Sequence, residues 1–283
     1  MKLTRRQFLT GVAALTAVTT ALDGVTFEHW WADWTQHTIA PHTVKIETTP
    51  LRIVQIADLH LRKLRWYHRE MAKKVLHSKP DLLVFTGDQV DQRHRLPVLE
   101  QFLKLFPLDL PKVAILGNWE YFCQLEVPKQ RRLYEKYNTR LLINESVELT
   151  LKGRSLLVTG LDEPLAGSPN LTQALKGHKP ARNHLTLAHC PETIHQIAAD
   201  LRLKQNQPHQ THLKTVLSGH THGGQIRLFD RVLHLPPGSA GFVNGWYDVS
   251  SLRMYVSRGI GTSIIPVRLG CRSEISVFDF LAA

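Results

Sequence analysis

Cysteine is scarce in this sequence, with only Cys123, Cys190 and Cys271 among 283 residues. No two of them form a Cys-x-x-Cys pair, and their odd number excludes a complete disulfide framework. Internal repeats and low-complexity runs are also absent from the sequence. The part of the chain after its N-terminal segment is therefore most simply one domain of about 240–250 residues.

Long apolar runs are missing as well. A membrane-spanning helix needs about 20 apolar residues, whereas residues 8–22 form a shorter run that is rich in threonine. This run follows Lys2, Arg5 and Arg6, and residues 4–9 resemble a twin-arginine export signal. We therefore expect recognition by the twin-arginine export machinery of a bacterium, and a location in the periplasm or on the outer face of the cytoplasmic membrane.

Whether this segment remains attached stays open, because no clean Ala-x-Ala cleavage site ends it. Three of the six tryptophans follow close together, at Trp30, Trp31 and Trp34. Tryptophan favours the membrane–water interface, so one interpretation is contact with a membrane surface; the other is that these rings cap the folded domain. We predict a signal or membrane anchor over residues 1–37 and a folded domain over residues 38–283.

Acidic residues are fewer than basic ones. The sequence has 24 Asp and Glu against 35 Lys and Arg, which gives a formal net charge of +11. Such a chain attracts anions. No helix-turn-helix, zinc-finger or aromatic-basic RNA-binding pattern is present in the sequence, so nucleic acid is not an expected partner. Phosphate-bearing substrates and lipid headgroups fit the charge.

Five short apolar runs each end in a polar residue of a metal-binding type. Buried strands of a parallel or mixed sheet have this continuous apolar character, and ligands of open α/β sheets gather at the carboxyl ends of strands. The runs cover residues 52–57, 81–87, 112–117, 184–188 and 215–219, and they end at Asp58, Asp88, Asn118, His189 and His220. We therefore expect all five endpoints at one edge of a sheet.

The segments between these runs complete the predicted pattern. Residues 68–78 and 96–106 place apolar side chains at helical spacing, and residues 274–280 are predicted to be the closing strand of a second sheet. In an extended segment, residues two apart project to the same side, so His220 and His222 can converge on one small region. The two glycines that follow allow a sharp turn.

These motifs resemble the calcineurin-like metallophosphoesterase superfamily. The resemblance rests on Asp58-x-His60, Gly87-Asp88, Gly117-Asn118, His189 and Gly219-His220-x-His222, in this order. Residues 141–145, 219–226 and 255–262 further resemble its exported branch, which includes twin-arginine phosphodiesterases and relatives of UDP-diacylglucosamine hydrolases. The resemblance implies an α/β fold, a four-layer α/β/β/α sandwich, with two metal ions at the strand ends.

The resemblance also implies a ligand set for each ion. Asp58, His60, Asp88 and His222 would hold the first ion, and Asp88, Asn118, His189 and His220 would hold the second. Asp88 would bridge the ions, and Asp88, Asn118 and His189 are the expected catalytic residues. Mixed imidazole and carboxylate ligands suit Mn, Fe or Zn, and two such ions can activate a shared water. Cys190 matches no ligand of the family and is interpreted as a small buried residue.

One position departs from the family pattern. Where the family usually has histidine after Gly-Asn, this chain has Trp119. The indole nitrogen is only a donor and does not titrate, so it cannot replace an acid that protonates the leaving oxygen. A general acid contributes about 10²–10⁴ in rate, so we expect the best activity on good leaving groups. Trp119 and His94 are candidate substrate contacts; His94 and His68 are alternative acids, although both are more simply surface histidines.

The sequence therefore predicts a metal-dependent hydrolase that cleaves a phosphodiester or pyrophosphate bond, in a substrate that is lipid-linked or contains a nucleotide. The alternative is a weakly active or non-catalytic protein that binds metal and phosphate on the same fold, because Trp119 replaces the usual histidine. In both cases residues 38–283 form the metallophosphoesterase domain.

Overall fold

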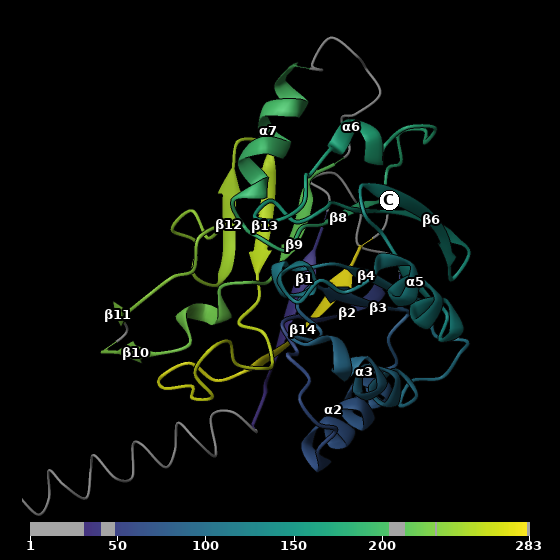
Figure 1. Cartoon of the computed structure of the whole chain (residues 1–283). Coiled ribbons are helices and arrows are strands. Elements are labelled where there is room, and N and C mark those ends of the chain that lie inside the picture. Colours follow the sequence, from purple (N-terminus) through teal and green to yellow (C-terminus); the bar gives the residue numbers. More distant parts are fainter. Residues whose placement is uncertain (1–30, 41–48, 204–212, 230, 282–283) are drawn as a thin grey trace, which may run out of the picture.

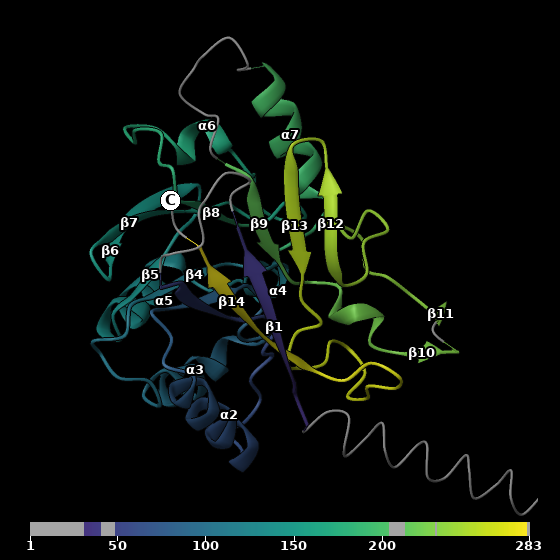
Figure 2. The same ribbon diagram turned by 180° about the vertical axis from the view of Figure 1, so that it is seen from behind.

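The protein is built around two six-stranded sheets (Figures 1 and 2). The computed structural model describes residues 31–40, 49–203, 213–229 and 231–281. The first sheet has the strand order β1 (Asp33–Ile39), β14 (Glu274–Phe280), β2 (Leu51–Ile56), β3 (Leu82–Thr86), β4 (Lys112–Ile115) and β5 (Thr139–Leu141). The second has the order β12 (Gly245–Val249), β13 (Leu252–Val256), β9 (Thr215–Ser218), β8 (His184–Leu187), β7 (Arg154–Gly160) and β6 (Glu145–Leu151).

Helices connect the parallel strands of both sheets. Strands β2 to β5 are mutually parallel, and their connections carry α2 (Trp66–His77), η1 (Arg93–Arg95), α3 (Leu96–Leu103), α4 (Asn118–Phe122) and α5 (Val127–Lys136). Strands β7, β8, β9 and β13 are also parallel. Their connections carry α6 (Leu171–Ala174), α7 (Thr193–Leu203), η2 (His222–Gly224) and the hairpin of β10 (Arg227–Leu228) and β11 (Arg231–Val232). The structure thus confirms the predicted helices over residues 68–78 and 96–106, since α2 and α3 occupy these segments.

Apolar side chains form three buried clusters. One lies between the sheets and includes Ile53 and Leu217. A second covers the outer face of the first sheet with α2, α3 and α5, where the ring centroids of Phe85 and Phe102 are 6.4 Å apart. A third packs α6 and α7, with Ile197, on the outer face of the second sheet. This order of helices, two sheets and helices confirms the predicted four-layer sandwich.

The predicted boundary after residue 37 falls inside strand β1. This strand pairs in parallel with β14 at the edge of the first sheet, so residues 33–37 belong to the folded domain. Trp34 is half-buried with Nζ of Lys74 5.1 Å from its ring centroid, whereas Trp31 is 69% exposed. The twin-arginine-like motif and Trp30 lie outside the described residues. No helix in the described part is both long and apolar enough to cross a bilayer.

Two strand predictions need correction. Residues 274–280 form β14, which pairs antiparallel with β2 in the first sheet and not in the second. The five strand ends also divide between the sheets: Asp58, Asp88 and Asn118 follow β2, β3 and β4, whereas His189 and His220 follow β8 and β9. The carboxyl ends of the parallel strands of both sheets meet at one edge of the sandwich, since His189 after β8 contacts Asn118 after β4.

Candidate dinuclear metal site

The seven predicted ligands lie together at the edge where the two sheets meet. All are buried, with exposed fractions of 5% or less. In the first group, Nε2 of His60 is 3.2 Å from Nε2 of His222 and 3.5 Å from Oδ2 of Asp88. A ligand atom of Asp58 lies within 4.8 Å of those of His60 and His222. These four side chains therefore form one candidate site for a cation.

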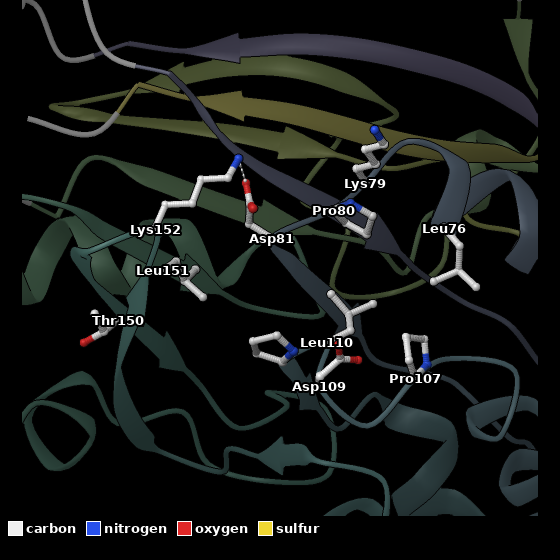
Figure 3. A pocket seen from close by; sticks show the side chains of 11 residues that line it. Leu76, Lys79, Pro80, Asp81, Pro107, Asp109, Leu110, Thr150, Leu151 and Lys152 are labelled. Carbon is white, nitrogen blue, oxygen red and sulfur yellow. Dashed lines mark ion pairs between the residues drawn. The ribbon is translucent and has the colours of Figure 1, made fainter.

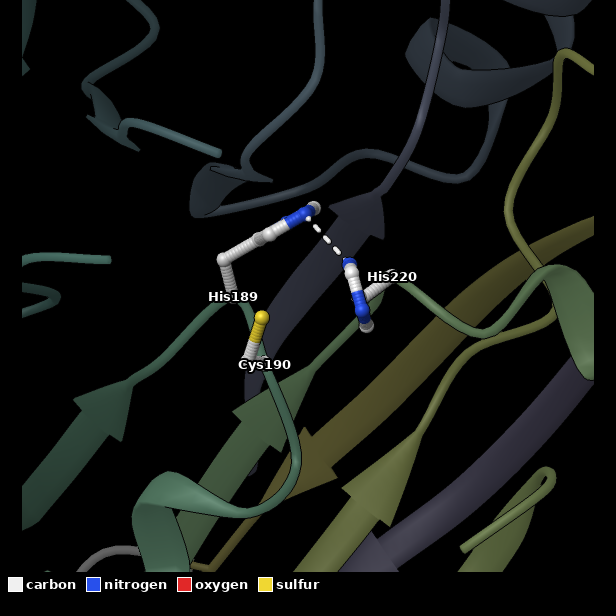
Figure 4. A group of neighbouring side chains, drawn as sticks. All are labelled: His189, Cys190 and His220. Carbon is white, nitrogen blue, oxygen red and sulfur yellow. Dashed lines mark hydrogen bonds between the residues drawn. The ribbon is translucent and has the colours of Figure 1, made fainter. Parts of the chain in front are cut away.

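A second group joins Asn118 of the first sheet to two histidines of the second (Figure 4 shows the histidines). Oδ1 of Asn118 is 3.1 Å from Nε2 of His189 and 3.0 Å from Nδ1 of His220. The two ring nitrogens are 3.2 Å apart. Three ligand atoms thus converge on one point from α4 and from the ends of β8 and β9.

Asp88 lies between the two groups. Its Oδ2 is 3.4 Å from Nε2 of His189 and 3.5 Å from Nε2 of His60. Its Oδ1 accepts a hydrogen bond from the backbone N–H of Trp119 at 2.9 Å. A single carboxylate oxygen is therefore the point that the two groups share.

The donor atoms of the second group fit a metal ion. Nδ1 of His189 is 2.8 Å from the carbonyl oxygen of Thr86, and Nε2 of His220 is 2.6 Å from that of Pro237. Because a carbonyl only accepts, these contacts place a proton on the outer nitrogen of each ring and direct the inner nitrogen at the site. Oδ2 of Asp58 is buried and has no hydrogen-bond partner among the described residues. Such a set of facing acceptors is complementary to a cation.

The electrostatics of the site also favour positive charge. Burial lowers the pKa of His60 and His222, and lowers that of His220 to about 4, so these rings are neutral and able to ligate near pH 7. Burial alone would lower the pKa of His189, but the Asp88 and Asp58 carboxylates and the carbonyl of Thr86 together outweigh it and raise this pKa to about 10. The carboxylates around His189 thus favour a positive charge at this position.

Most of the candidate ligands have positive φ angles, which residues other than glycine rarely adopt. Positive φ angles occur at five of the seven candidate ligands, namely Asp58 (51°), His60 (41°), Asp88 (55°), His220 (74°) and His222 (51°). Such residues cost of order 1–3 kcal/mol each and cluster at functional sites. A Cβ at Gly87 (φ 90°) would lie 2.3 Å from Nδ1 of His189, and one at Gly117 would lie 2.2 Å from Oδ1 of Asp88. The glycines of these motifs therefore allow the ligands to pack closely.

Glu120 supports the Asp88 loop, a role that the sequence did not indicate. Its Oε2 accepts the backbone N–H groups of Asp88 and Gly117, and its Oε1 accepts those of Gln89 and Val90. The side chain is buried. Only its position two residues after Asn118 could have pointed to it, because the family pattern has an acidic residue there.

Arg268 is a second supporting residue that was not predicted. Its side chain is fully buried. Its guanidinium donates to the carbonyl oxygens of Gly261 at 2.6 Å and Arg258 at 2.8 Å, and lies 3.3 Å from that of His222. It therefore ties residues 258–261 to the segment that carries His222.

Trp119 is half-buried and stands beside the buried ligands, on the side of the site that we call its mouth. The Trp119 ring stands edge-on to His60 at 6.0 Å between centroids. His94 is exposed on η1 and, in the described part of the chain, has no hydrogen bond or ring contact to the seven residues. The prediction that His68 lies at the surface is wrong. Its side chain is buried in the first turn of α2, and its ring packs against Phe102 of α3.

Cys190 agrees with its interpretation as a small buried residue. It lies beside His189 and His220 (Figure 4), within ligand range of both. Its thiol donates to Oε1 of Glu163 at 3.0 Å. Burial raises the pKa of this thiol, which disfavours the thiolate that binds metals.

The pocket in Figure 3 is separate from the metal site. It has a volume of about 380 Å³, and Pro80 and Pro111 in its lining precede β3 and β4. Asp81 and Lys152 form a 2.7 Å ion pair there. The pocket thus lies at the amino ends of these strands, opposite the candidate ligands.

Comparison with known proteins identifies the family. Residues 51–224 match the family model described as calcineurin-like phosphoesterase. The chain belongs to this family. It is therefore a metal-dependent phosphoester hydrolase, and divalent metal ions are the cofactors that the family implies.

Two relatives match along nearly their whole length. The uncharacterized metallophosphoesterase YkuE of Bacillus subtilis (strain 168) is 30% identical, over 98% of this chain and 97% of the relative. The phosphodiesterase YaeI of Escherichia coli (strain K12) is 25% identical, over 99% and 100%. Among solved structures, the 5'-nucleotidase precursor from Thermus thermophilus has a TM-score of 0.43 and 14% identity; the match covers 74% of this chain and 49% of that longer one.

Proposed function

We propose that this chain is a dinuclear phosphodiesterase. Asp58, His60, Asp88 and His222 would hold the first ion, and Asp88, Asn118, His189 and His220 would hold the second. The position of Asp88 Oδ2, 3.4 and 3.5 Å from the inner nitrogens of His189 and His60, carries this proposal because it belongs to both groups. The mixture of imidazole, carboxylate and amide ligands favours Mn, Fe or Zn.

The residues of the chain have distinct parts in the reaction. Two divalent ions held by these residues would supply Lewis-acid chemistry, which activates a water at neutral pH and stabilises the negative charge that develops on the phosphoester oxygens. The carbonyls of Thr86 and Pro237 fix the ring orientations of His189 and His220. Arg62 and Lys63 follow His60 closely in sequence and are exposed, so they attract an anionic substrate to the mouth.

The substrate is a phosphodiester or pyrophosphate with a good leaving group, such as a nucleotide-containing or lipid-linked molecule. The relative named phosphodiesterase YaeI supports a diester. Trp119 supports the leaving-group preference because its indole cannot protonate a leaving oxygen. The exposed His94 has no hydrogen bond or ring contact with the seven ligands in the described part of the chain. Like the exported branch that includes UDP-diacylglucosamine hydrolase relatives, the enzyme acts outside the cytoplasmic membrane after twin-arginine export, for which the N-terminal sequence is the support.

Hydrolysis of a substrate panel by the metal-loaded full chain tests this function. Aryl phosphomonoesters, aryl and alkyl diesters and pyrophosphates are offered with Mn, Fe or Zn. We expect diesters or pyrophosphates to be cleaved in preference to monoesters, and activity to disappear on chelation. Equal inactivity on every compound by a chain that retains two ions would contradict it.

A second candidate function is binding of metal and phosphate esters with little turnover. Trp119 favours it, because its indole nitrogen donates to Oγ of Ser263 at 3.2 Å and no acid occupies its place. In the same panel, binding of product phosphate without hydrolysis of any aryl diester would select this function.

A further inference from the structure

Exposed apolar side chains gather on two loops beside the metal site. Among the described residues, eleven large hydrophobic side chains are exposed, and five of these lie on the β10–β11 hairpin and on residues 263–266. We call this set the apolar rim: Phe229 (100% exposed), Ile264 (81%), Leu233 (61%), Ile265 (51%) and Leu228 (45%). The remaining exposed hydrophobic residues are dispersed over other elements, so the rim is the main concentration.

The two loops form one surface. The side chain of Gln225 donates to the carbonyls of Ser263 and Ile265 at 3.2 and 2.9 Å and accepts the N–H of Ser263 at 2.9 Å. The N–H of Arg227 donates to the carbonyl of Leu269 at 2.7 Å. Figures 1 and 2 show the hairpin and the yellow segment beside it projecting together from the same side of the sandwich.

The fold does not explain the residues of the rim. Phe229 follows β10 at the turn of the hairpin with φ 50°, and Ile264 has φ 59°. This region favours glycine and asparagine, and a β-branched side chain there is a genuine outlier. Both side chains also leave apolar surface in water. The two most exposed members of the rim are therefore unfavourable both in backbone conformation and in solvation.

The rim adjoins the mouth of the metal site through Trp119. Its indole nitrogen donates to Oγ of Ser263, the residue before Ile264, and its ring stands edge-on to His60. Gln225, which joins the two loops, lies three residues after His222. Trp119 and Ser263 therefore connect the metal site to the segment that carries Ile264 and Ile265.

We propose that the apolar rim docks on the surface of an anionic lipid bilayer and holds the mouth of the metal site against it. Charge supports this partner, because Arg231 and Arg272 near the rim are exposed, as are Arg62 and Lys63 at the mouth. One part of this proposal rests on the proposed function, namely that docking presents a lipid-linked diester to the metal site. Docking itself does not require turnover.

The first described strand, β1, begins next to residues 258–273. The N–H of Asp33 donates to the carbonyl of Ser273, and its carboxylate pairs with Arg258 at 3.0 Å. The residues that precede it in sequence include the apolar run 8–22. Residues 258–273 carry two of the five rim residues, Ile264 and Ile265.

Site-specific fluorescence on the full chain tests docking. An environment-sensitive probe is attached at Phe229→Cys or, as reference, at Leu203→Cys, which is 84% exposed at the end of α7; labelled wild type gives the background from Cys123, Cys190 and Cys271. With vesicles containing phosphatidylglycerol, we expect the emission of the probe at 229 to brighten, shift to shorter wavelength and be quenched by brominated acyl chains. The emission of the probe at 203 should remain that of a probe in water.

Two results overturn the proposal. One is emission typical of water from the probes at both positions on vesicle-bound protein. The other is a concentration-dependent change at 229 without vesicles, because it assigns the rim to a second copy of the chain.

Asparagine variants separate docking from folding. Phe229→Asn and Ile264→Asn suit the left-handed backbone, so the double variant should melt no lower than wild type. We expect its turnover of a vesicle-borne lipid-linked diester to fall at least about tenfold, with turnover of a soluble aryl diester unchanged. The matched control is Leu203→Asn with Leu108→Asn, both exposed and outside the rim; an equal loss in this control overturns the proposal. If wild type cleaves no diester, the proposed function fails, whereas the probe experiment still decides docking.

Discussion

The backbone N–H of Trp119 donates to Oδ1 of Asp88 at 2.9 Å. The residue at position 119 therefore positions the candidate bridging carboxylate through its backbone N–H, a contact that does not depend on its side chain. Two roles that the family pattern combines in one short motif, metal binding and assistance to the leaving group, therefore depend on different parts of this segment. Holding the metals depends on the turn that begins at Gly117, whereas assisting the leaving group depends on the side chain that follows Asn118.

Trp119→His should raise turnover of poor leaving groups far more than of good ones. A histidine here supplies an acid worth up to about 10²–10⁴ in rate when the leaving oxygen needs a proton. Metal content should not change, because the backbone hydrogen bond remains. Separate values of kcat and KM for an alkyl and an aryl phosphodiester provide the measurement. An equal decrease of both parameters on both substrates would show that the leaving-group explanation is wrong.

The sequence indicated which polar residues lie together at the strand ends more clearly than it indicated the edges of the sheets. Strands such as β3, with the buried sequence Leu82–Thr86, are apolar throughout because both faces are covered, and the polar residue that ends each one stands out. Strand β1 lacks this signal. It lies at an edge, and its buried contacts come from residues such as His37, whose ring packs on Tyr255 and Phe278.

The partner of a strand is not contained in its own residues. Residues 274–280 are apolar enough for either sheet, and only their pairing with β2 places them in the first. Glu120 was missed for a related reason: its function is to bind four backbone N–H groups, and backbone groups have no sequence signature. Long-range pairing and backbone ligation thus account for most of what the sequence did not indicate.

Glu120→Gln should destabilise the protein and weaken metal binding. An amide presents an NH₂ group to two of the four N–H donors in either orientation, and buried donors without an acceptor cost about 1–3 kcal/mol each. We therefore expect a loss of about 2–4 kcal/mol in the free energy of unfolding, measured by denaturant titration. Glu126→Gln is the control, since Glu126 is exposed and pairs only with Lys129 in a 2.6 Å surface contact. Equal stability of the two variants would contradict this role of Glu120.

Deleting residues 1–30 and deleting residues 1–39 should have different effects. The shorter deletion retains every described residue, and we expect a folded, active chain. The longer one removes β1, including Asp33 and Thr35, which contact Arg258 and the buried Glu274. The loop after Arg258 packs on the metal site, with the N–H of Gly261 2.7 Å from the carbonyl of Asp58.

For the longer deletion we expect the melting temperature to fall by roughly 5–10 °C, as a loss of about 2–3 kcal/mol implies for a domain of this size. Metal affinity should decrease with it. Differential scanning calorimetry of the two deletions and the full chain provides the comparison. Identical melting of both deletions would show that β1 contributes nothing to the domain.

Removal of the metals should lower stability, because the site then brings acceptor atoms together without a cation between them. A ligand at 100 times its Kd stabilises the folded state by about 2.7 kcal/mol, so chelation should lower the melting temperature and added Mn or Zn should restore it. In His220→Ala the melting temperature should no longer respond to chelator or added metal, whereas in the exposed His94→Ala it should respond as in wild type. This pair of results would assign the stabilisation to the candidate metal site. A melting temperature independent of chelator would contradict a structural contribution of the metals.

Metal analysis of Asp88→Ala tests the central claim most directly. Oδ2 of Asp88 lies at the point shared by both groups of ligands, so its loss should remove both ions and essentially all hydrolysis. Asp81→Ala, which breaks an ion pair at the opposite edge of the sheet, is the matched control and should keep both. The account predicts two ions per chain in wild type and control and none retained in Asp88→Ala after desalting. Two ions retained by Asp88→Ala would contradict the bridging role of Asp88.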